Sequence, residues 1–190
     1  MSLLGTPLKW VIALAPLGMA FYMSSRLMSM SVTGVQTCLM IFATLMGLSL
    51  STIFILFTGE SIARVFFITA STFGAMSVYG HTTKRDLTSM GSFLMMGVIG
   101  LFIASVVNIF MQSGVLQFVI SIIGVVVFTL FTAYDSQKIK ALYYKTQSNA
   151  LITHKLAIYA SLALYMDFIN IFVFLLQLLG VRRMPVRWWL

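Results

Sequence analysis

Charged residues are scarce in this 190-residue chain, and acidic residues are the scarcest. Charged residues make up 8% of the chain and hydrophobic residues 60%, whereas soluble domains carry about a quarter charged residues. Twelve Lys and Arg stand against four Asp and Glu, for a net charge of +8. Several apolar runs reach the roughly 20 residues that a helix needs to cross a bilayer. The composition excludes a soluble domain and predicts an all-α polytopic membrane protein.

Cysteine and long polar segments are also nearly absent. Cys38 is the only cysteine, which excludes an intrachain disulfide and a cysteine-based metal site. It lies in an apolar run, where we expect a packed thiol. No linker separates domains, and no soluble module offers the basic face that a nucleic-acid binder needs. We therefore predict one transmembrane domain over residues 1–190 that contacts the lipid bilayer and binds no nucleic acid.

Signatures of enzymes are missing as well. His81 and His154 stand far apart in predicted polar loops, without the HExxH spacing of zinc hydrolases. No GxSxG nucleophile elbow occurs. The fourteen methionines are scattered, which favours packing over a copper route. With no nucleophile–base pair visible, we predict neither an enzyme nor a bound cofactor.

Six apolar runs are long enough to cross a membrane. If each run crosses once, the polar connections 24–31, 80–89 and 135–155 share one side, and they hold most of the lysines and arginines. The positive-inside rule predicts that this side is cytoplasmic. The predicted spans cover residues 8–25, 33–57, 61–80, 91–112, 115–134 and 155–179.

The tail after Gly180 conflicts with this topology, because its arginines would also prefer the cytoplasm. A last segment that re-enters without crossing would satisfy them. Segment 155–179 is nevertheless long enough to cross, and we favour crossing.

One acid lies inside the last apolar run. Asp167 belongs to LALYMDFINIFVFLLQLLG, residues 162–180, and an ionisable group at membrane depth is a functional-site hypothesis by default. Residues on its face of the helix are small or polar except for one Phe, while the other faces carry Leu, Ile and Phe. This pattern predicts a face turned toward protein. The face consists of Ala160, Ala163, Asp167, Asn170, Phe174 and Gln177.

The fifth span carries a matching face that ends in a second acid, Asp135. Two carboxylates that face each other in a low-dielectric site cannot both ionise easily, and they titrate as a coupled pair. Such a pair would make a proton-controlled latch possible. The face of the fifth span consists of Ser121, Gly124, Phe128, Thr132 and Asp135.

Two alternatives stay open for these acids. Asp135 is near a span end, where it can be solvated or cap the following loop, and Asp167 can be a structural hydrogen-bonding group. Asp135 also lies near the interface, whereas Asp167 lies ~18 Å deep at 1.5 Å per residue. The two acids meet only if the helices are offset or the last helix starts outside the hydrocarbon. With carbonyls and water they would make only a weak Ca²⁺ site, since Ca²⁺ takes six to eight oxygens.

Three further charged residues have simple interpretations. Glu60 and Arg64 have the spacing and order of a favourable salt bridge at a helix start. Arg26 ends the first predicted span, where it fits a topology anchor. It is also a candidate cation for Asp135.

Four segments resemble a known family: residues 60–80, 79–101, 131–140 (FTAYDSQKIK) and 162–180. They are closely similar to the Bax inhibitor-1 family, especially its bacterial YccA-like branch, and the resemblance covers nearly the whole chain. It implies a last helix at the centre of the bundle, wrapped by six others, in the bacterial inner membrane. Family members normally have seven helices, and the first is missing here. We therefore expect Met1 to begin a truncated chain, a misassigned start or a short natural variant.

The resemblance also implies a function. Members of the family are associated with a pH-sensitive, passive calcium leak across membranes, and two aspartates on the last two helices form the proton-sensing pair. The matching positions are Asp135 and Asp167. The two helical faces described above add Ser121, Thr132, Asn170 and Gln177 as supporting polar residues. A family arginine near the end of the second helix helps to latch the closed state, and Arg26 falls in that neighbourhood. The YccA-like branch implies an alternative, a non-conducting regulator of a membrane-anchored ATP-dependent protease.

Overall fold

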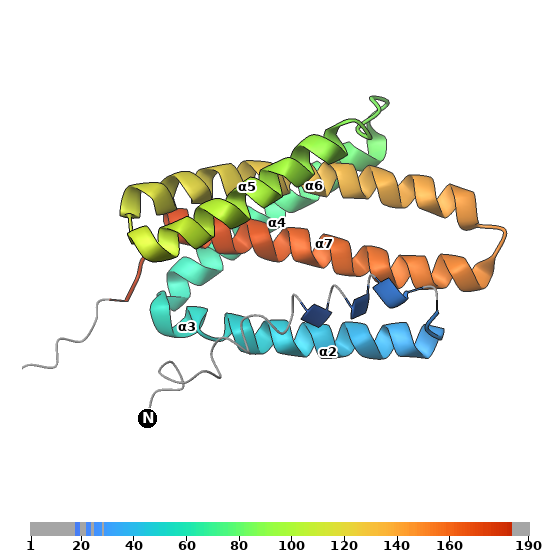
Figure 1. Cartoon of the computed structure of the whole chain (residues 1–190), viewed down its shortest axis with the longest axis horizontal. Helices are drawn as coiled ribbons and strands as arrows, with labels where there is room; N and C mark the ends of the chain where they lie inside the picture. Colours follow the sequence, from blue (N-terminus) through green and yellow to red (C-terminus); the bar gives the residue numbers. More distant parts are fainter. Residues whose placement is uncertain (1–17, 20–21, 24, 28, 184–190) are drawn as a thin grey trace, which may run out of the picture. The chain divides into compact units, whose positions relative to one another are not determined.

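The computed structural model describes residues 18–19, 22–23, 25–27 and 29–183 (Figure 1). Within them, five stretches are helical, long and apolar enough to cross a membrane: Val32–Leu56, Gly59–Thr82, Met90–Met111, Gly114–Thr146 and Ala150–Leu179. They confirm an all-α membrane protein and the last five predicted spans. The predicted span 8–25 lies almost wholly outside the described residues. The helices are α2 (Val32–Leu50), α3 (Ile53–Leu56), α4 (Gly59–Thr82), α5 (Met90–Met111), α6 (Gly114–Thr146) and α7 (Ala150–Leu179).

Short polar signals set the helix ends. Ser31 and Thr58 cap the starts of α2 and α4, where their side chains accept hydrogen bonds from Gly34 N and Ser61 N. At the end of α5, Gln112 adopts a left-handed conformation with φ 50° and donates to the Asn108 carbonyl at 2.8 Å. The chain can then reverse directly into α6.

The last two helices are longer than the sequence predicted. α6 runs for 33 residues to Thr146 and α7 for 30 residues from Ala150, so the predicted polar connection 135–155 is mostly helical. The reason is that residues 125–179 contain neither Gly nor Pro, and polarity alone does not end a helix. The turn forms at Asn149, whose Oδ1 accepts from Ile152 N at 3.2 Å.

The chain divides into two compact units. Unit 1 comprises Met1–Leu56 and Leu142–Leu162, and unit 2 comprises Phe57–Ala141 and Ala163–Leu190. In unit 1, α2 buries Val35, Cys38 and Phe42. The Cys38 side chain is 7% exposed, which confirms the predicted packed thiol.

In unit 2, aromatic side chains join α7 to the helices beside it. The Phe168 ring lies 5.6 Å from that of Phe66 and 5.5 Å from that of Phe73, both on α4. On the α6 side, the Phe174 and Phe128 rings stack with centroids 5.9 Å apart. α5 packs on α6 through a small core of Leu101, Ile120 and Val127. The carboxyl-terminal half of α7 thus contacts both α4 and α6.

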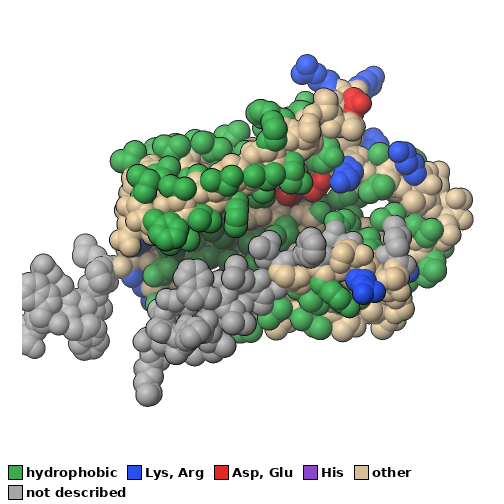
Figure 2. Space-filling model, in the orientation of Figure 1, with side chains coloured by type: hydrophobic (Ala, Val, Ile, Leu, Met, Phe, Trp, Pro, Cys, Tyr) green, Lys and Arg blue, Asp and Glu red, His purple; other side chains and the backbone are tan. Residues whose placement is uncertain are grey.

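The outward faces of the helices are strongly apolar. Phe67 on α4 and Phe110 on α5 are 69% and 83% exposed, and hydrophobic side chains cover much of the face shown in Figure 2. Such side chains are stable only against lipid, not water. These faces therefore contact the lipid bilayer, as predicted.

The segment after α7 binds the start of α4. Thr58 N donates to the Val181 carbonyl at 3.0 Å, and Val181 N donates to Ser61 Oγ at 2.9 Å. Arg183 Nε donates to the Phe57 carbonyl at 3.1 Å. The tail therefore begins at the end of unit 2 where α4 begins, opposite the loop that follows α4. This placement favours a last helix that crosses the membrane.

Candidate functional site

The packing of α6 against α7 fixes their register. A Cβ on Gly124 would lie 2.6 Å from the Phe174 ring, and Ser121 Oγ donates to Gln177 Oε1 at 3.0 Å. If this register continues along the two antiparallel helices, residue 163 lies opposite Asp135. Asp167 then lies one helical turn further along α7. One turn is about 6 Å, so the predicted difference of ~18 Å in depth is wrong. The wrong depth difference arose because the fifth span was predicted to end at residue 134 and the sixth to begin at residue 155.

The two acids differ in their surroundings. Asp167 is 4% exposed, and its Oδ2 accepts no hydrogen bond from any residue that the structure describes. The Asp135 carboxylate is close enough for its charge to act on Asp167. Asp135 is half-buried and lies near the Lys138 ammonium, three residues further along α6. Only Asp167 therefore has a buried, unpartnered carboxylate oxygen within the described part of the chain.

The predicted supporting residues divide between two places. Thr132 is fully buried one turn before Asp135, and its hydroxyl donates to the Phe128 carbonyl at 2.9 Å. Asn170 is half-buried on α7. Ser121 and Gln177 lie away from the acids, near the turn between α5 and α6.

Around Gln177, amide side chains link three helices. Asn108 Nδ2 on α5 donates to Gln117 Oε1 at 3.0 Å, and Gln117 Nε2 on α6 donates to Gln177 Oε1 at 2.6 Å. Ser121 Oγ donates to the same Gln177 oxygen. Asn108 and Gln117 were not among the residues predicted from the sequence, although Gln117 lies one turn before Ser121 on the same face.

We expect Gln177→Leu to lower the free energy of unfolding by about 1 kcal/mol, because the amide of Gln117 loses its acceptor, while the hydroxyl of Ser121 keeps the Gln117 carbonyl. Thermal unfolding in detergent measures the change. Gln36→Leu, at an exposed position on α2, is the matched control and should stay within about 0.5 kcal/mol of wild type. Equal losses in both variants would contradict a structural role for the amide network.

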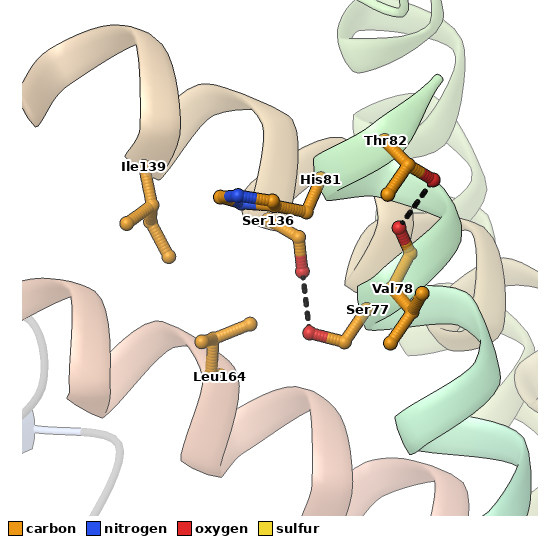
Figure 3. A pocket seen from close by; sticks show the side chains of 7 residues that line it. All are labelled: Ser77, Val78, His81, Thr82, Ser136, Ile139 and Leu164. Carbon is orange, nitrogen blue, oxygen red and sulfur yellow. Dashed lines mark hydrogen bonds between the residues drawn. The ribbon is translucent and has the colours of Figure 1, made fainter. Parts of the chain in front are cut away.

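A cleft of about 320 Å³ lies between α4, α6 and α7, beside the acids. Ser77 Oγ of α4 and Ser136 Oγ of α6 are 3.0 Å apart across it, and Figure 3 shows these two side chains pointing toward each other. Ile139 lies one helical turn after Asp135 and Leu164 about one turn before Asp167, so the cleft lies near the two acids, although neither of them lines it. It is lined by Ser77, Val78, His81, Thr82, Ser136, Ile139 and Leu164.

The structure places two histidines differently from what the sequence predicted, and it adds one serine to the cleft. His81 is not in a loop: it belongs to the last turn of α4 and lines the cleft, and His154 is helical too, on α7. Ser77 was missed. The sequence carries no signal that singles it out, because Ser and Thr recur along α4 without a common helical face.

The other charged groups agree with simple roles. Arg64 Nη2 lies 3.0 Å from Glu60 Oε1, and both side chains are exposed, so the predicted salt bridge is confirmed. Arg26 is exposed, and its carbonyl accepts from Ser29 N and Met30 N. Arg26 belongs to unit 1 whereas Asp135 belongs to unit 2, and the latch role of Arg26 stays a prediction.

The acids fit a passing cation better than a resident one. No group of three or more His, Cys, Asp or Glu side chains occurs within the described residues. Two carboxylates supply too few oxygens to hold Ca²⁺ tightly. Ca²⁺ is therefore considered below as cargo.

Comparison with known proteins agrees with the sequence resemblance. The family model described as inhibitor of apoptosis-promoting Bax1 matches residues 1–184. The chain is 50% identical over 173 residues to protein RP147 of Rickettsia prowazekii, covering 91% of this chain and 73% of that protein. It is 43% identical over 187 residues to the inner membrane protein YbhL of Escherichia coli K12, covering 96% and 80%.

The name of the Escherichia coli relative gives information on the cellular location of this protein and on its branch of the family. YbhL is an inner membrane protein, which confirms the predicted bacterial inner membrane. Its name is not YccA, so assignment to the YccA-like branch stays a prediction. On the match of the family model over nearly the whole chain, this protein belongs to the Bax inhibitor-1 family.

Proposed function

We propose that this chain is a passive, pH-sensitive leak pathway for Ca²⁺ or other cations across the inner membrane. Asp135 and Asp167 would control its opening. The observation that carries the proposal is the buried, unpartnered oxygen of Asp167 beside a second carboxylate. An ionisable group in that position is costly and marks ion or proton pathways in membrane proteins.

The chemistry of the pair supplies the switch. When the two carboxyl groups share one proton, a hydrogen bond between them holds α6 against α7 and the pathway is closed. When both carboxylates are charged, they repel each other and water enters between the helices. The separated carboxylates attract a cation, and their small number of oxygens lets it leave again.

The rest of unit 2 is suited to the same role. The cleft at Ser77 and Ser136 is the proposed mouth of the pathway next to the acids. At the other end, the amide network of Gln117 and Gln177 joins α6 to α7. In the proposed pathway, ions pass this point only when those hydrogen bonds break. We also place α7 at the centre of the bundle. In support, 33% of the residues in its most apolar stretch are buried, against 6–22% in the other four candidate spans of the described residues.

Calcium flux into proteoliposomes, measured from pH 5 to pH 9, tests the proposal. Asp135→Asn and Asp167→Asn should each flatten or displace the pH dependence of flux, because one titrating partner is gone. Asp86→Asn is the matched control: it removes an exposed acid from the loop after α4 and should leave the curve unchanged. Identical curves for wild type and both pair variants would reject the proposal.

The second candidate function is regulation of a membrane-anchored ATP-dependent protease without conduction. The loop after α4 favours it, because the Gln137 side chain accepts one hydrogen bond from the loop and donates another to it, which holds the loop in a fixed shape that a partner can recognise. Purified protein that passes no ions at any pH, together with cross-linking to such a protease in membranes, would indicate this function instead.

A further inference from the structure

A second cleft, of about 310 Å³, lies where α4 ends and α5 begins. Part of its lining is polar and exposed: Arg85, Asp86 and Ser89. The rest is largely apolar, comes from three different helices and the loop, and is more buried except for Tyr79, which is 43% exposed. This part consists of Met76 and Tyr79 on α4, Leu87 in the loop, Met90 on α5, and Leu130 and Ala133 on α6. The cleft is therefore amphipathic, with a charged rim beside an apolar wall.

The rim is held in place by α6. Gln137 Oε1 accepts from Leu87 N at 2.8 Å, and Gln137 Nε2 donates to the Arg85 carbonyl at 2.8 Å. Asp86 Oδ1 accepts from Thr88 N at 2.9 Å. The backbone that carries Arg85 is thus ordered before any ligand binds, which lowers the entropic cost of binding.

Positive charge dominates this end of unit 2. Lys84 and Arg85 are exposed, and the ion pair of Glu60 with Arg64 lies at the other end of α4. Lys138 lies over the Tyr134 ring, 5.6 Å from its centroid, and that ring packs against Gly91 at the start of α5. In Figure 2, cationic side chains gather around the loop that joins α4 and α5.

Asp86 is the opposing charge on the rim. Hydrogen bonds from the Thr88 side chain and backbone lower the pKa of Asp86 below its usual value, so this carboxylate is ionised at neutral pH. Arg85 balances this charge on the rim, and the neighbouring exposed Lys84 leaves the loop with a net positive charge that attracts anions.

We propose that this cleft binds an anionic phospholipid, with the phosphate at Arg85 and an acyl chain along the wall formed by Met76 and Leu130. Arginine binds phosphate through paired N–H donors, and basic pockets between membrane helices on the cytoplasmic side bind anionic head groups. A water-soluble phosphate would use the rim and leave the apolar wall uncovered. A lipid covers both, at the depth where head group and chain meet.

Lipid binding to the purified chain tests this inference, by native mass spectrometry with phosphatidylglycerol or phosphatidylcholine of the same acyl chains. Wild type should prefer phosphatidylglycerol. Arg85→Gln should weaken that binding about fivefold, the loss expected for one basic residue near an anionic head group. The matched control is Arg64→Gln, at the other end of α4 with Glu60 as its partner, and it should change binding less than twofold.

A second variant tests the apolar wall. Leu130→Trp fills the cleft without changing its charge and should also weaken phosphatidylglycerol binding, while glycerol phosphate should compete poorly. Equal effects of Arg85→Gln and Arg64→Gln would overturn the inference, as would equal binding of the two lipids. Competition by glycerol phosphate as strong as by the lipid would assign the rim to a soluble anion. The outcome is independent of ion conduction.

Discussion

Gly80→Ala is expected to lower the free energy of unfolding by about 1–3 kcal/mol, the range for overpacking a close contact. At Gly80, a Cβ would collide with the backbone carbonyl of Ala133, so the backbones of α4 and α6 touch there. A backbone carbonyl within a helix cannot turn aside as a side chain can. The two helices must move apart, and membrane helices rely on such small residues for close packing.

Two hydrogen bonds between α4 and α6 lie near the contact of Gly80 with Ala133. They should lengthen if the two helices move apart. Ser77 Oγ and Ser136 Oγ are 3.0 Å apart, and Lys140 Nζ donates to the His81 carbonyl at 2.8 Å. A disulfide between cysteines introduced at Ser77 and Ser136 should therefore form more slowly in the Gly80→Ala background. Calcium flux should change too, because Ser136 adjoins Asp135.

Gly74→Ala is the matched control on the same helix. Nothing lies within 4 Å of a Cβ at that position, and alanine is the better helix former. Its stability should equal or exceed that of wild type in thermal unfolding in detergent. If Gly80→Ala unfolds at the same temperature as Gly74→Ala, close packing of α4 on α6 does not limit stability.

Periodicity in the sequence predicted which faces of the last two helices meet. The faces that hold Gly124 and Phe174 do pack together, because small and polar residues are stable only where protein covers them. Helix ends were harder to predict. The polar residues from Asp135 to Lys145 indicated a loop, yet they continue α6, since a helix can extend from the hydrocarbon into the head-group region without a break.

Contacts between distant residues lay beyond the sequence alone. Gln137 holds a loop that lies about 50 residues earlier in the chain, and only the packing of α6 on α4 and α5 brings them together. The same is true of Ser77 and Ser136. A hydropathy pattern records which side of a helix is buried, but not which helix covers it.

Asp167→Asn is expected to stabilise the protein while it flattens the pH dependence of ion flux. The ionised carboxylate is 4% exposed, lacks a hydrogen-bond partner at Oδ2 among the described residues, and lies near Asp135. Burying an unpaired charge costs several kcal/mol, even after local relaxation. Asparagine has nearly the same shape and no charge, and its amide can donate to the carboxylate of Asp135. We expect a gain of about 1–3 kcal/mol together with a flatter pH dependence of flux, the trade-off common at functional sites.

Thermal unfolding in detergent between pH 5 and pH 9 measures this gain. The difference from wild type should be largest at high pH and shrink as the pH falls, because protonation then removes the charge from Asp167 as well. Asp135→Asn is the matched control on the partner helix. Its gain should be smaller, since Asp135 is half-buried and already lies near Lys138. If Asp167→Asn is less stable than wild type at every pH, Asp167 instead stabilises the bundle as a hydrogen-bonding group, and the switch must lie elsewhere.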